Sequence, residues 1–238
     1  MIGTHVGNYR ILSHIGSGGM GDVYLAEHMH IGRKVAIKVI LPQFAQLDQI
    51  RARFLLEAKT MALLSHPNIV QVYEFFDDQN GLFLVLEFVD GVTLEEMVLN
   101  KTGPLSDERL VPLFRQILSG FEYAHVQGLV HRDIKPANIM ITKSGDVKIL
   151  DFGIAKIMES NSRLTSTGAR IGTILYMSPE QIRGGSLDQR SDIYSFGCVL
   201  YELVTGKPPF TGSTPNELLS KHISSPVPSP PPPLQTLF

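Results

Sequence analysis

Short apolar runs dominate the N-terminal part of the chain. Runs over residues 9–15, 23–28, 34–40, 70–76 and 82–88 are rich in β-branched and apolar residues and are bounded by glycines or turn-forming residues. Each run is typical of a β-strand. A longer stretch at about 47–65 instead carries Phe54, Ala58 and Met61 at helical spacing. This part of the chain is therefore predicted to be a small β-sheet with one helix.

The pattern becomes helical further along. An amphipathic stretch over residues 106–127 and a strongly apolar stretch over residues 192–205 predict two helices, with short strands and a polar loop over residues 158–173 between them. Residues 224–233 are rich in proline and serine, which excludes regular helix and central strand. Both parts together predict an α+β fold.

Composition narrows the class of protein. With 43% apolar and 18% charged residues in 238, the chain is expected to be globular. A net charge of −2 argues against a nucleic-acid partner. Cys198 is the only cysteine, which excludes an intramolecular disulfide and favours a reducing, cytoplasmic compartment. We expect no signal peptide and no membrane span in this chain. A membrane tether encoded beyond Phe238 stays open.

A glycine-rich loop, Gly16-Ser17-Gly18-Gly19-Met20-Gly21, follows the first strand. This pattern occurs in dinucleotide sites, where a helix must follow, and in hairpins that cover ATP phosphates with backbone N–H groups. Residues 23–28 predict a strand, which favours the hairpin and argues against a Rossmann oxidoreductase. For this motif alone, an ordinary glycine-rich hairpin is an equal alternative.

Lys38 ends the apolar strand Val35-Ala36-Ile37-Lys38. Glu57 lies on or beside the buried face of the helix at 47–65, because it is three residues after Phe54. A carboxylate there needs a cation, and Lys38 is the expected partner. A movement of that helix would make or break the pair.

The segment His131-Arg132-Asp133-Ile134-Lys135-Pro136-Ala137-Asn138, with Asp151-Phe152-Gly153 thirteen residues later, is the most specific feature. With the glycine loop, Lys38 and Glu57 in the same order, it resembles the protein kinase family. Phrases around residues 9–12, 89–94 and 168–180 resemble the bacterial eukaryotic-like (Hanks-type) serine/threonine kinases. The resemblance implies a bilobal kinase fold. It also implies that the protein acts in signalling.

That resemblance implies a role for each motif residue. Asp133 would accept the proton of the substrate hydroxyl, Lys135 would lie near the transferred phosphate and mark serine/threonine specificity, and Lys38 paired with Glu57 would hold the α/β-phosphates. Asn138 and Asp151 would hold Mg²⁺, with Mn²⁺ as an alternative. The residues implied to contact ATP are Ile15, Gly16, Ser17, Gly18, Gly19, Met20, Gly21, Val23, Ala36, Lys38, Leu86, Glu87, Val89 and Met140.

The hydroxyl-rich loop predicts regulation. In the family, an arginine like Arg132 pairs with a phosphorylated activation loop, so autophosphorylation at Thr165 or Thr167, in trans within a homodimer, is our hypothesis. A solvated loop with incidental hydroxyls is the alternative. The resemblance also implies that Thr173 contacts the catalytic Asp and Lys, and that Asp192 anchors the catalytic-loop backbone or caps its own helix.

The resemblance divides the chain into a small lobe at 7–88, a large lobe at 89–223 and a Pro-rich tail at 224–238. The family's large lobe has further helices and an arginine that pairs with the residue matching Glu180. We therefore expect a large lobe without its last helices and Glu180 without its partner. A truncated, inactive kinase-like module that binds nucleotide or a protein is the second hypothesis.

Overall fold

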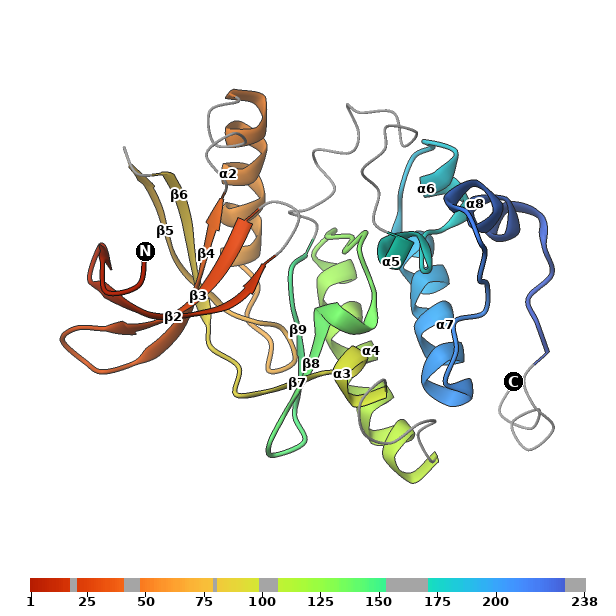
Figure 1. Cartoon of the computed structure of the whole chain (residues 1–238), viewed down its shortest axis with the longest axis horizontal. Coiled ribbons are helices and arrows are strands. Elements are labelled where there is room, and N and C mark those ends of the chain that lie inside the picture. The colour runs from red at the N-terminus through yellow and green to blue at the C-terminus, as the bar shows by residue number, and fades with distance from the viewer. Residues whose placement is uncertain (18–20, 41–47, 79–80, 99–106, 153–170, 230–238) are drawn as a thin grey trace. The chain divides into compact units, whose positions relative to one another are not determined.

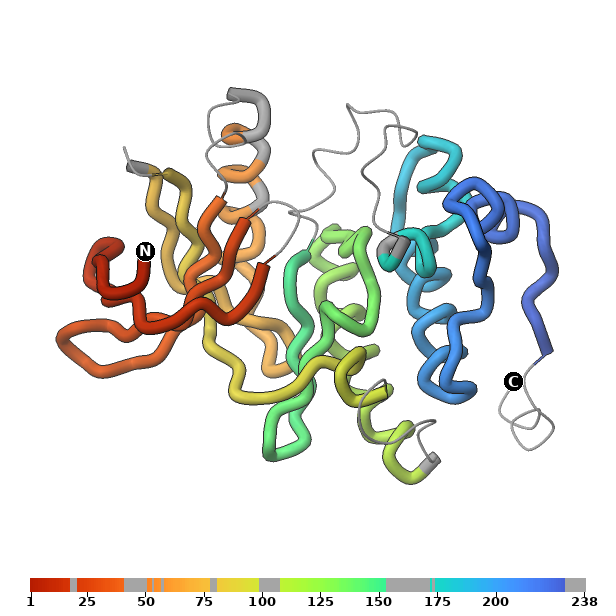
Figure 2. Tube along the Cα trace, in the orientation of Figure 1, coloured from red at the N-terminus to blue at the C-terminus, as the bar shows by residue number. Residues whose placement is uncertain are grey.

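The computed structural model describes residues 1–17, 21–40, 48–78, 81–98, 107–152 and 171–229 (Figure 1). Internal contacts divide the chain into two compact units, Met1–Asp90 and Gly91–Phe238. Each unit is described by itself. Figure 2 follows the chain through both units from red to blue.

The N-terminal unit is a six-stranded sheet in the order β1-β2-β3-β4-β6-β5. Every neighbouring pair is antiparallel. The predicted strands and the helix are therefore present. The elements are β1 (His5–Val6), β2 (Tyr9–Ser17), β3 (Gly21–His28), β4 (Lys34–Ile40), α2 (Asp48–Ala62), β5 (Val72–Asp78) and β6 (Gly81–Glu87).

One face of this sheet forms an apolar core. Alternate residues of the central strands, Ala26, Val35, Ile37, Phe83 and Val85, pack with residues of β1 and β2 in a single buried cluster. The alternation follows from the pleat of a strand, in which successive side chains point to opposite faces. The residues between them must therefore line the other face.

Helix α2 packs on that other face. Phe75 of β5 lies opposite Leu84 of β6, one residue from the core positions, and its ring centroid is 5.7 Å from that of Phe54 of α2. Phe54, Ala58 and Met61 are buried, so the helical spacing predicted the packed face of α2 correctly. Helix α2 ends at Ala62, three residues before the predicted end.

The C-terminal unit is mainly helical, with a small antiparallel sheet in the order β7-β8-β9. The elements of this unit are β7 (Gly91–Thr93), α3 (Leu94–Met97), α4 (Asp107–Val126), η2 (Pro136–Asn138), β8 (Ile139–Thr142), β9 (Val147–Ile149), α5 (Ile171–Ile174), α6 (Pro179–Ile182), α7 (Gln189–Thr205) and α8 (Pro215–Ser224). Among the described residues of the chain, no helix has the length and apolar character to cross a bilayer.

Three predicted boundaries in this unit were wrong. Helix α7 begins at Gln189, and Asp188, not Asp192, is its N-cap, because the Asp188 side chain accepts from the N–H of Arg190. Residues 171–173, the end of the segment predicted as loop, belong to the short helix α5. Ser224 is the last residue of α8, so helix reaches into the expected tail. The helix predicted at 106–127 is α4.

Candidate active site

The segment from the end of α4 through η2 brings three polar residues together. Lys135 donates from Nζ to Asp133 Oδ2 at 2.8 Å. Asn138 donates from Nδ2 to the same carboxylate oxygen at 3.0 Å and to the carbonyl oxygen of Asp133 at 2.8 Å. Asp133 is 8% exposed and Asn138 is 9% exposed, so this network is largely withdrawn from water. Both donors use Oδ2, which leaves Oδ1 as the oxygen to face a hydroxyl group.

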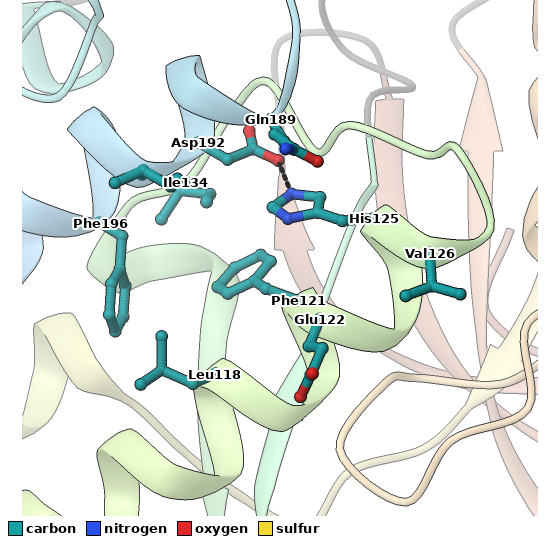
Figure 3. Close-up of a pocket in the computed structure, with 10 residues that line it drawn as sticks. Leu118, Phe121, Glu122, His125, Val126, Ile134, Gln189, Asp192 and Phe196 are labelled. Carbon is teal, nitrogen blue, oxygen red and sulfur yellow. Dashed lines mark hydrogen bonds and ion pairs between the residues drawn. The ribbon is translucent and has the colours of Figure 1, made fainter.

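Asp192 of α7 holds the backbone of this loop. Its carboxylate accepts the N–H of His131 at 2.7 Å and the N–H of Arg132 at 2.8 Å. His125 of α4 contributes a third contact, from Nε2 to Asp192 Oδ2 at 2.8 Å (Figure 3). The anchoring role implied for Asp192 is therefore confirmed, and its reading as a helix cap is wrong because it lies inside the first turn.

Arg132 has an unusual backbone conformation, with φ of 66°. A non-glycine residue with positive φ is strained, and the strain persists only where surrounding contacts hold it. Here Asp192 accepts the Arg132 N–H, and Gln181 of α6 donates from Nε2 to the Arg132 carbonyl at 2.8 Å. The arginine side chain is exposed. Hydrogen bonds thus hold the loop at both the N–H and the carbonyl of this strained residue.

His131 is a buried, neutral link to the next motif. Its Nδ1 accepts the N–H of Asp133 at 3.2 Å and its Nε2 donates to the carbonyl of Leu150 at 2.8 Å. Burial lowers the pKa of His131, against the pull of nearby carboxylates, of which Asp192 is the strongest. Leu150 directly precedes Asp151, so the histidine couples the two predicted catalytic segments.

Asp151 and Asn138 carry oxygens suited to a hard cation. The amide nitrogen of Asn138 is engaged by Asp133, so its amide oxygen is the atom that can coordinate. Asp151 supplies a carboxylate and has φ of 48°, a second non-glycine residue in the left-handed region. Within the described ranges, no group of three or more His, Cys, Asp or Glu side chains could hold a metal. Two protein oxygen ligands suit Mg²⁺, because this ion commonly takes its remaining ligands from water and phosphate groups.

In the N-terminal unit, the sheet register gathers residues expected to contact ATP. Val23 lies opposite Lys38, and Ala36 lies opposite Leu86. Ala36 and Lys38 are two residues apart on β4, so all four side chains point to one face. This is the face that α2 covers, through Phe54 and Phe75. Lys38 is 6% exposed, which is rare for a lysine.

The ends of the glycine loop form the predicted hairpin. Gly16 pairs with Val23 and Ser17 pairs with Asp22 in an antiparallel ladder, so a strand does follow the loop. A helix there, as dinucleotide binding requires, is excluded. Ile15 is exposed beside the loop. Gly18, Gly19 and Met20 lie outside the described residues.

The segment expected to contact adenine ends β6. The N–H of Glu87 donates to the carbonyl of Gln71 at 2.9 Å, so the carbonyl of Glu87 and the backbone of Val89 are the better candidates for adenine. Val89 is half-buried. Met140, the remaining predicted contact, is half-buried on β8 opposite Thr93.

Thr165 and Thr167 lie outside the described residues, as do the side chains of Glu57 and Thr173. Glu180, expected to lack its arginine partner, accepts a hydrogen bond from Ser191 Oγ at 2.5 Å. Burial raises the pKa of Glu180, but hydrogen bonds from Ser191, its own N–H and Ser178 outweigh it and hold the pKa below its usual value. The expectation concerned an arginine, so the contact with Ser191 does not contradict it and it stays a prediction.

Sequence reasoning missed two residues of this region, His125 and Gln181. Gln181 follows Ser178 by three residues, and the pair forms a capping box on α6, a signal that the sequence contains. The same side chain reaches Arg132, which no local pattern indicates. His125 had no such signal, because its partner Asp192 is 67 residues away.

The chain is similar to proteins of one family. The family model described as protein kinase domain matches residues 9–229. A probable serine/threonine-protein kinase of Streptomyces coelicolor is 45% identical over 222 residues, covering 91% of this chain and 33% of the relative. Serine/threonine-protein kinase PknB of Mycobacterium tuberculosis is 42% identical, covering 92% and 36%. Serine/threonine-protein kinase PrkC of Bacillus subtilis is 41% identical, covering 96% and 35%. The chain thus spans about a third of the length of these relatives.

Proposed function

Because the chain belongs to the protein kinase family, we propose that it transfers the γ-phosphoryl group of ATP to serine and threonine hydroxyls of proteins. The observation that carries the proposal is the Asp133 carboxylate, fixed through Oδ2 by Lys135 and Asn138. Phosphoryl transfer asks a protein mainly for alignment and charge neutralisation, and this network supplies both. The names of the relatives support serine/threonine specificity.

Asp133 and Lys135 have different proposed roles at the attacking hydroxyl group. Asp133 orients the substrate hydroxyl through Oδ1 and accepts its proton as the oxygen attacks phosphorus. Lys135, 2.8 Å from Oδ2, keeps the carboxylate in place and offers a positive charge beside the moving phosphoryl group. The hydrogen bonds that the Arg132 backbone forms with Asp192 and Gln181 hold the loop in its strained conformation. The Asp133 carboxylate is therefore positioned before the substrate binds.

ATP and Mg²⁺ are the proposed cofactors, with Mn²⁺ as a substitute metal. Bound Mg²⁺ neutralises phosphate charge, and Asn138 and Asp151 would hold it. The proposed nucleotide-contacting residues are those that the resemblance implied, with Val23, Ala36 and Leu86 against adenine. The shared sheet face of these three residues with Lys38 supports this assignment.

Lys38 is proposed to pair with Glu57. Helix α2 lies on the Lys38 face of the sheet, which the 5.7 Å ring contact of Phe54 with Phe75 supports. In the sequence Glu57 follows Phe54 by three residues, the spacing of neighbouring positions on one side of a helix. A lysine buried in this way is stabilised by a nearby anion, which is the role proposed for the Glu57 carboxylate.

Autophosphorylation is the proposed regulation. Phosphate on Thr165 or Thr167 would add nearly two negative charges and bind Arg132, whose side chain is exposed and whose backbone is held. Transfer between two copies would make activation depend on protein concentration.

The decisive experiment measures ³²P transfer from [γ-³²P]ATP to a generic protein substrate, myelin basic protein, and to the chain itself. Wild type, Lys38→Met and Asp133→Asn are compared, with Lys148→Met, a half-buried lysine on β9, as matched control. We expect both active-site variants to lose transfer and the control to keep it. Equal transfer by wild type and Asp133→Asn would overturn the proposal.

The second hypothesis is an inactive module that binds nucleotide. It predicts saturable ATP binding by isothermal calorimetry with no phosphate transfer in any variant. Phosphopeptide mapping of active wild type tests the regulatory part separately. Active protein with neither Thr165 nor Thr167 phosphorylated would contradict that part and leave the transfer activity standing.

A further inference from the structure

Three polar side chains join the two strand ends that flank the glycine loop. Ser17, the last residue of β2, donates from Oγ to Asp22 Oδ1 of β3 at 2.7 Å. His14 Nε2 lies 3.1 Å from the same serine oxygen and 3.4 Å from Asp22 Oδ1. These three residues are called the cross-strand cluster. The proposed function gives no role to His14 or Asp22.

The cross-strand cluster depends on a bulge in β2. Between the pairs His14–Tyr24 and Gly16–Val23, strand β2 has one residue more than β3. In a regular strand His14 and Ser17 would point to opposite faces, because they are three residues apart. The extra residue shifts the alternation and brings both side chains to one face. The ring contact of His14 with Tyr24, 5.2 Å between centroids, agrees with this placement.

The cluster lies on the face of the hairpin opposite to the residues expected to contact ATP. Asp22 and Tyr24 are two residues apart on β3 and share a face, whereas Val23 points to the other face. Tyr24 packs against the apolar core of the sheet, and Val23 lies opposite Lys38. Any effect of the cluster on a nucleotide therefore passes through the backbone of the hairpin.

The donor and acceptor roles in the cluster follow from its distances. Ser17 has one hydroxyl proton and donates it to Asp22, so its oxygen accepts from His14. The hydrogen bond from Ser17 is the main cause that holds the pKa of Asp22 below its usual value, so the carboxylate is charged at neutral pH. His14 Nε2 must therefore carry a hydrogen. It cannot take the proton of Ser17, which excludes the chemistry of a serine hydrolase triad.

Pairing of these strand ends has a high entropic cost. Three of the four residues between Ser17 and Asp22 are glycines. Glycine loses more backbone freedom on ordering than any other residue, so a glycine-rich hairpin is costly to hold in one conformation. Cross-strand side-chain contacts offset part of such a cost. The cluster is located where this offset has the greatest effect on the loop.

We propose that His14 and Asp22 are positioning residues for the nucleotide. Together with the Ser17 hydroxyl, they hold the strand ends in register, so that the backbone N–H groups of the hairpin are arranged before ATP phosphates bind. This inference rests on the proposed role of the hairpin in nucleotide binding. Arrangement before binding lowers the cost of ordering the site, so the effect falls on nucleotide affinity.

Four single variants test the inference. His14→Phe keeps a ring beside Tyr24 and removes Nε2, Asp22→Ala removes both acceptors, and Asp22→Asn restores one acceptor oxygen. Glu27→Ala is the matched control, because Glu27 pairs with Arg10 at 3.2 Å between the same two strands and at similar exposure. Isothermal calorimetry measures the Kd of AMP-PNP with Mg²⁺ for the whole chain, and steady-state kinetics measures KM for ATP and kcat.

We expect His14→Phe and Asp22→Ala each to raise the Kd of AMP-PNP and the KM for ATP about two- to fivefold, the range of exposed polar pairs. The value of kcat should change less than KM. Asp22→Asn should keep most of the affinity, and Glu27→Ala should bind as wild type. The double variant His14→Phe/Asp22→Ala should lose little more than either single variant, because the residues act together.

Three results would overturn this inference alone: equal Kd for wild type and Asp22→Ala, equal weakening by Glu27→Ala, or additive losses in the double variant. The second result would assign the effect to the general stability of the hairpin. A raised Kd in the cluster variants, with no phosphate transfer by wild type, would reject only the proposed function. Failure of wild type to bind AMP-PNP would overturn both. Circular dichroism checks that each variant folds.

Discussion

The carboxylate of Asp192 accepts the backbone N–H of His131 at 2.7 Å, although the two residues are 61 positions apart in the chain. The same carboxylate accepts the N–H of Arg132 and contacts His125. A buried acid, 2% exposed, is thus satisfied by backbone and imidazole donors and not by a salt bridge with lysine or arginine among the described residues. Its effect is to fix a strained loop at the start of the catalytic segment.

Substitution Asp192→Asn should damage both stability and activity. An amide has one acceptor oxygen and would turn an NH₂ group toward backbone N–H donors, so at least one buried donor loses its partner. We expect a loss of about 2–4 kcal/mol in the free energy of unfolding, as for a buried charged hydrogen-bond network. Urea unfolding followed by circular dichroism measures it.

The matched control for that substitution is Asp188→Asn, on the exposed cap of the same helix. Asparagine caps nearly as well as aspartate, so the change should be under about 0.5 kcal/mol. Equal losses in both variants would show that Asp192 acts only through the helix terminus and not through the loop.

Stability should fall as pH falls below about 6.5, in part through His222. This side chain is 4% exposed, its Nδ1 lies 2.9 Å from Tyr194 Oη, and within the described part of the chain its Nε2 has no hydrogen-bond partner. Burial lowers the pKa of His222 in the folded protein. Below the unfolded value of about 6.5 the unfolded chain therefore binds a proton that the folded chain does not, and stability decreases until the folded pKa is passed.

The variant His222→Gln should flatten this decrease. Unfolding free energies from urea titrations at pH 7.5, 6.5 and 5.5 measure the slope. His30→Gln, at an exposed histidine, is the control and should keep the wild-type slope. A slope unchanged by His222→Gln would mean that other groups, His131 among them, account for it.

Gly21 and Gly16 should have opposite roles. A Cβ on Gly21 would collide with the backbone carbonyl of Val39, because the two strands approach closely there. A Cβ on Gly16 would meet nothing within 4 Å. We expect Gly21→Ala to lose about 1–3 kcal/mol of stability, as overpacking does. Thermal unfolding compares the two variants.

Gly16→Ala should instead keep wild-type stability and raise the KM for ATP, because a methyl group on the loop would hinder backbone approach to phosphate. Steady-state kinetics with varied ATP measures this. An unchanged KM with unchanged stability would contradict a phosphate-covering role for Gly16.

Metal dependence provides a test of Asn138 and Asp151. Excess EDTA should abolish phosphoryl transfer, and added Mg²⁺ should restore it. Asp151→Asn should raise the Mg²⁺ concentration needed for half-maximal activity by at least about tenfold, as loss of a carboxylate ligand weakens a hard cation site. Asp146→Asn, in the exposed turn between β8 and β9, is the control and should titrate as wild type. Equal Mg²⁺ titrations for both variants would exclude Asp151 as a ligand.

Local sequence determined much of this protein. The strand after the glycine loop was enough to distinguish a hairpin from a dinucleotide fold, because alternation of apolar residues reports a strand without any tertiary contact. The spacing of Phe54, Ala58 and Met61 predicted which side of α2 is buried, since a helix has one period. The order of the motifs identified the family.

Tertiary structure decided the contacts that join distant segments. That His125, His131 and Arg132 all meet Asp192 depends on how α4 and α7 pack, and no local pattern records it. The same reason explains why the N-cap of α7 was predicted at the wrong residue. Asp188 and Asp192 are both acceptable N-caps by residue type, and only the packing shows that Asp192 lies inside the first turn. Periodicity determines which side of an element is buried, whereas packing alone determines what that side contacts.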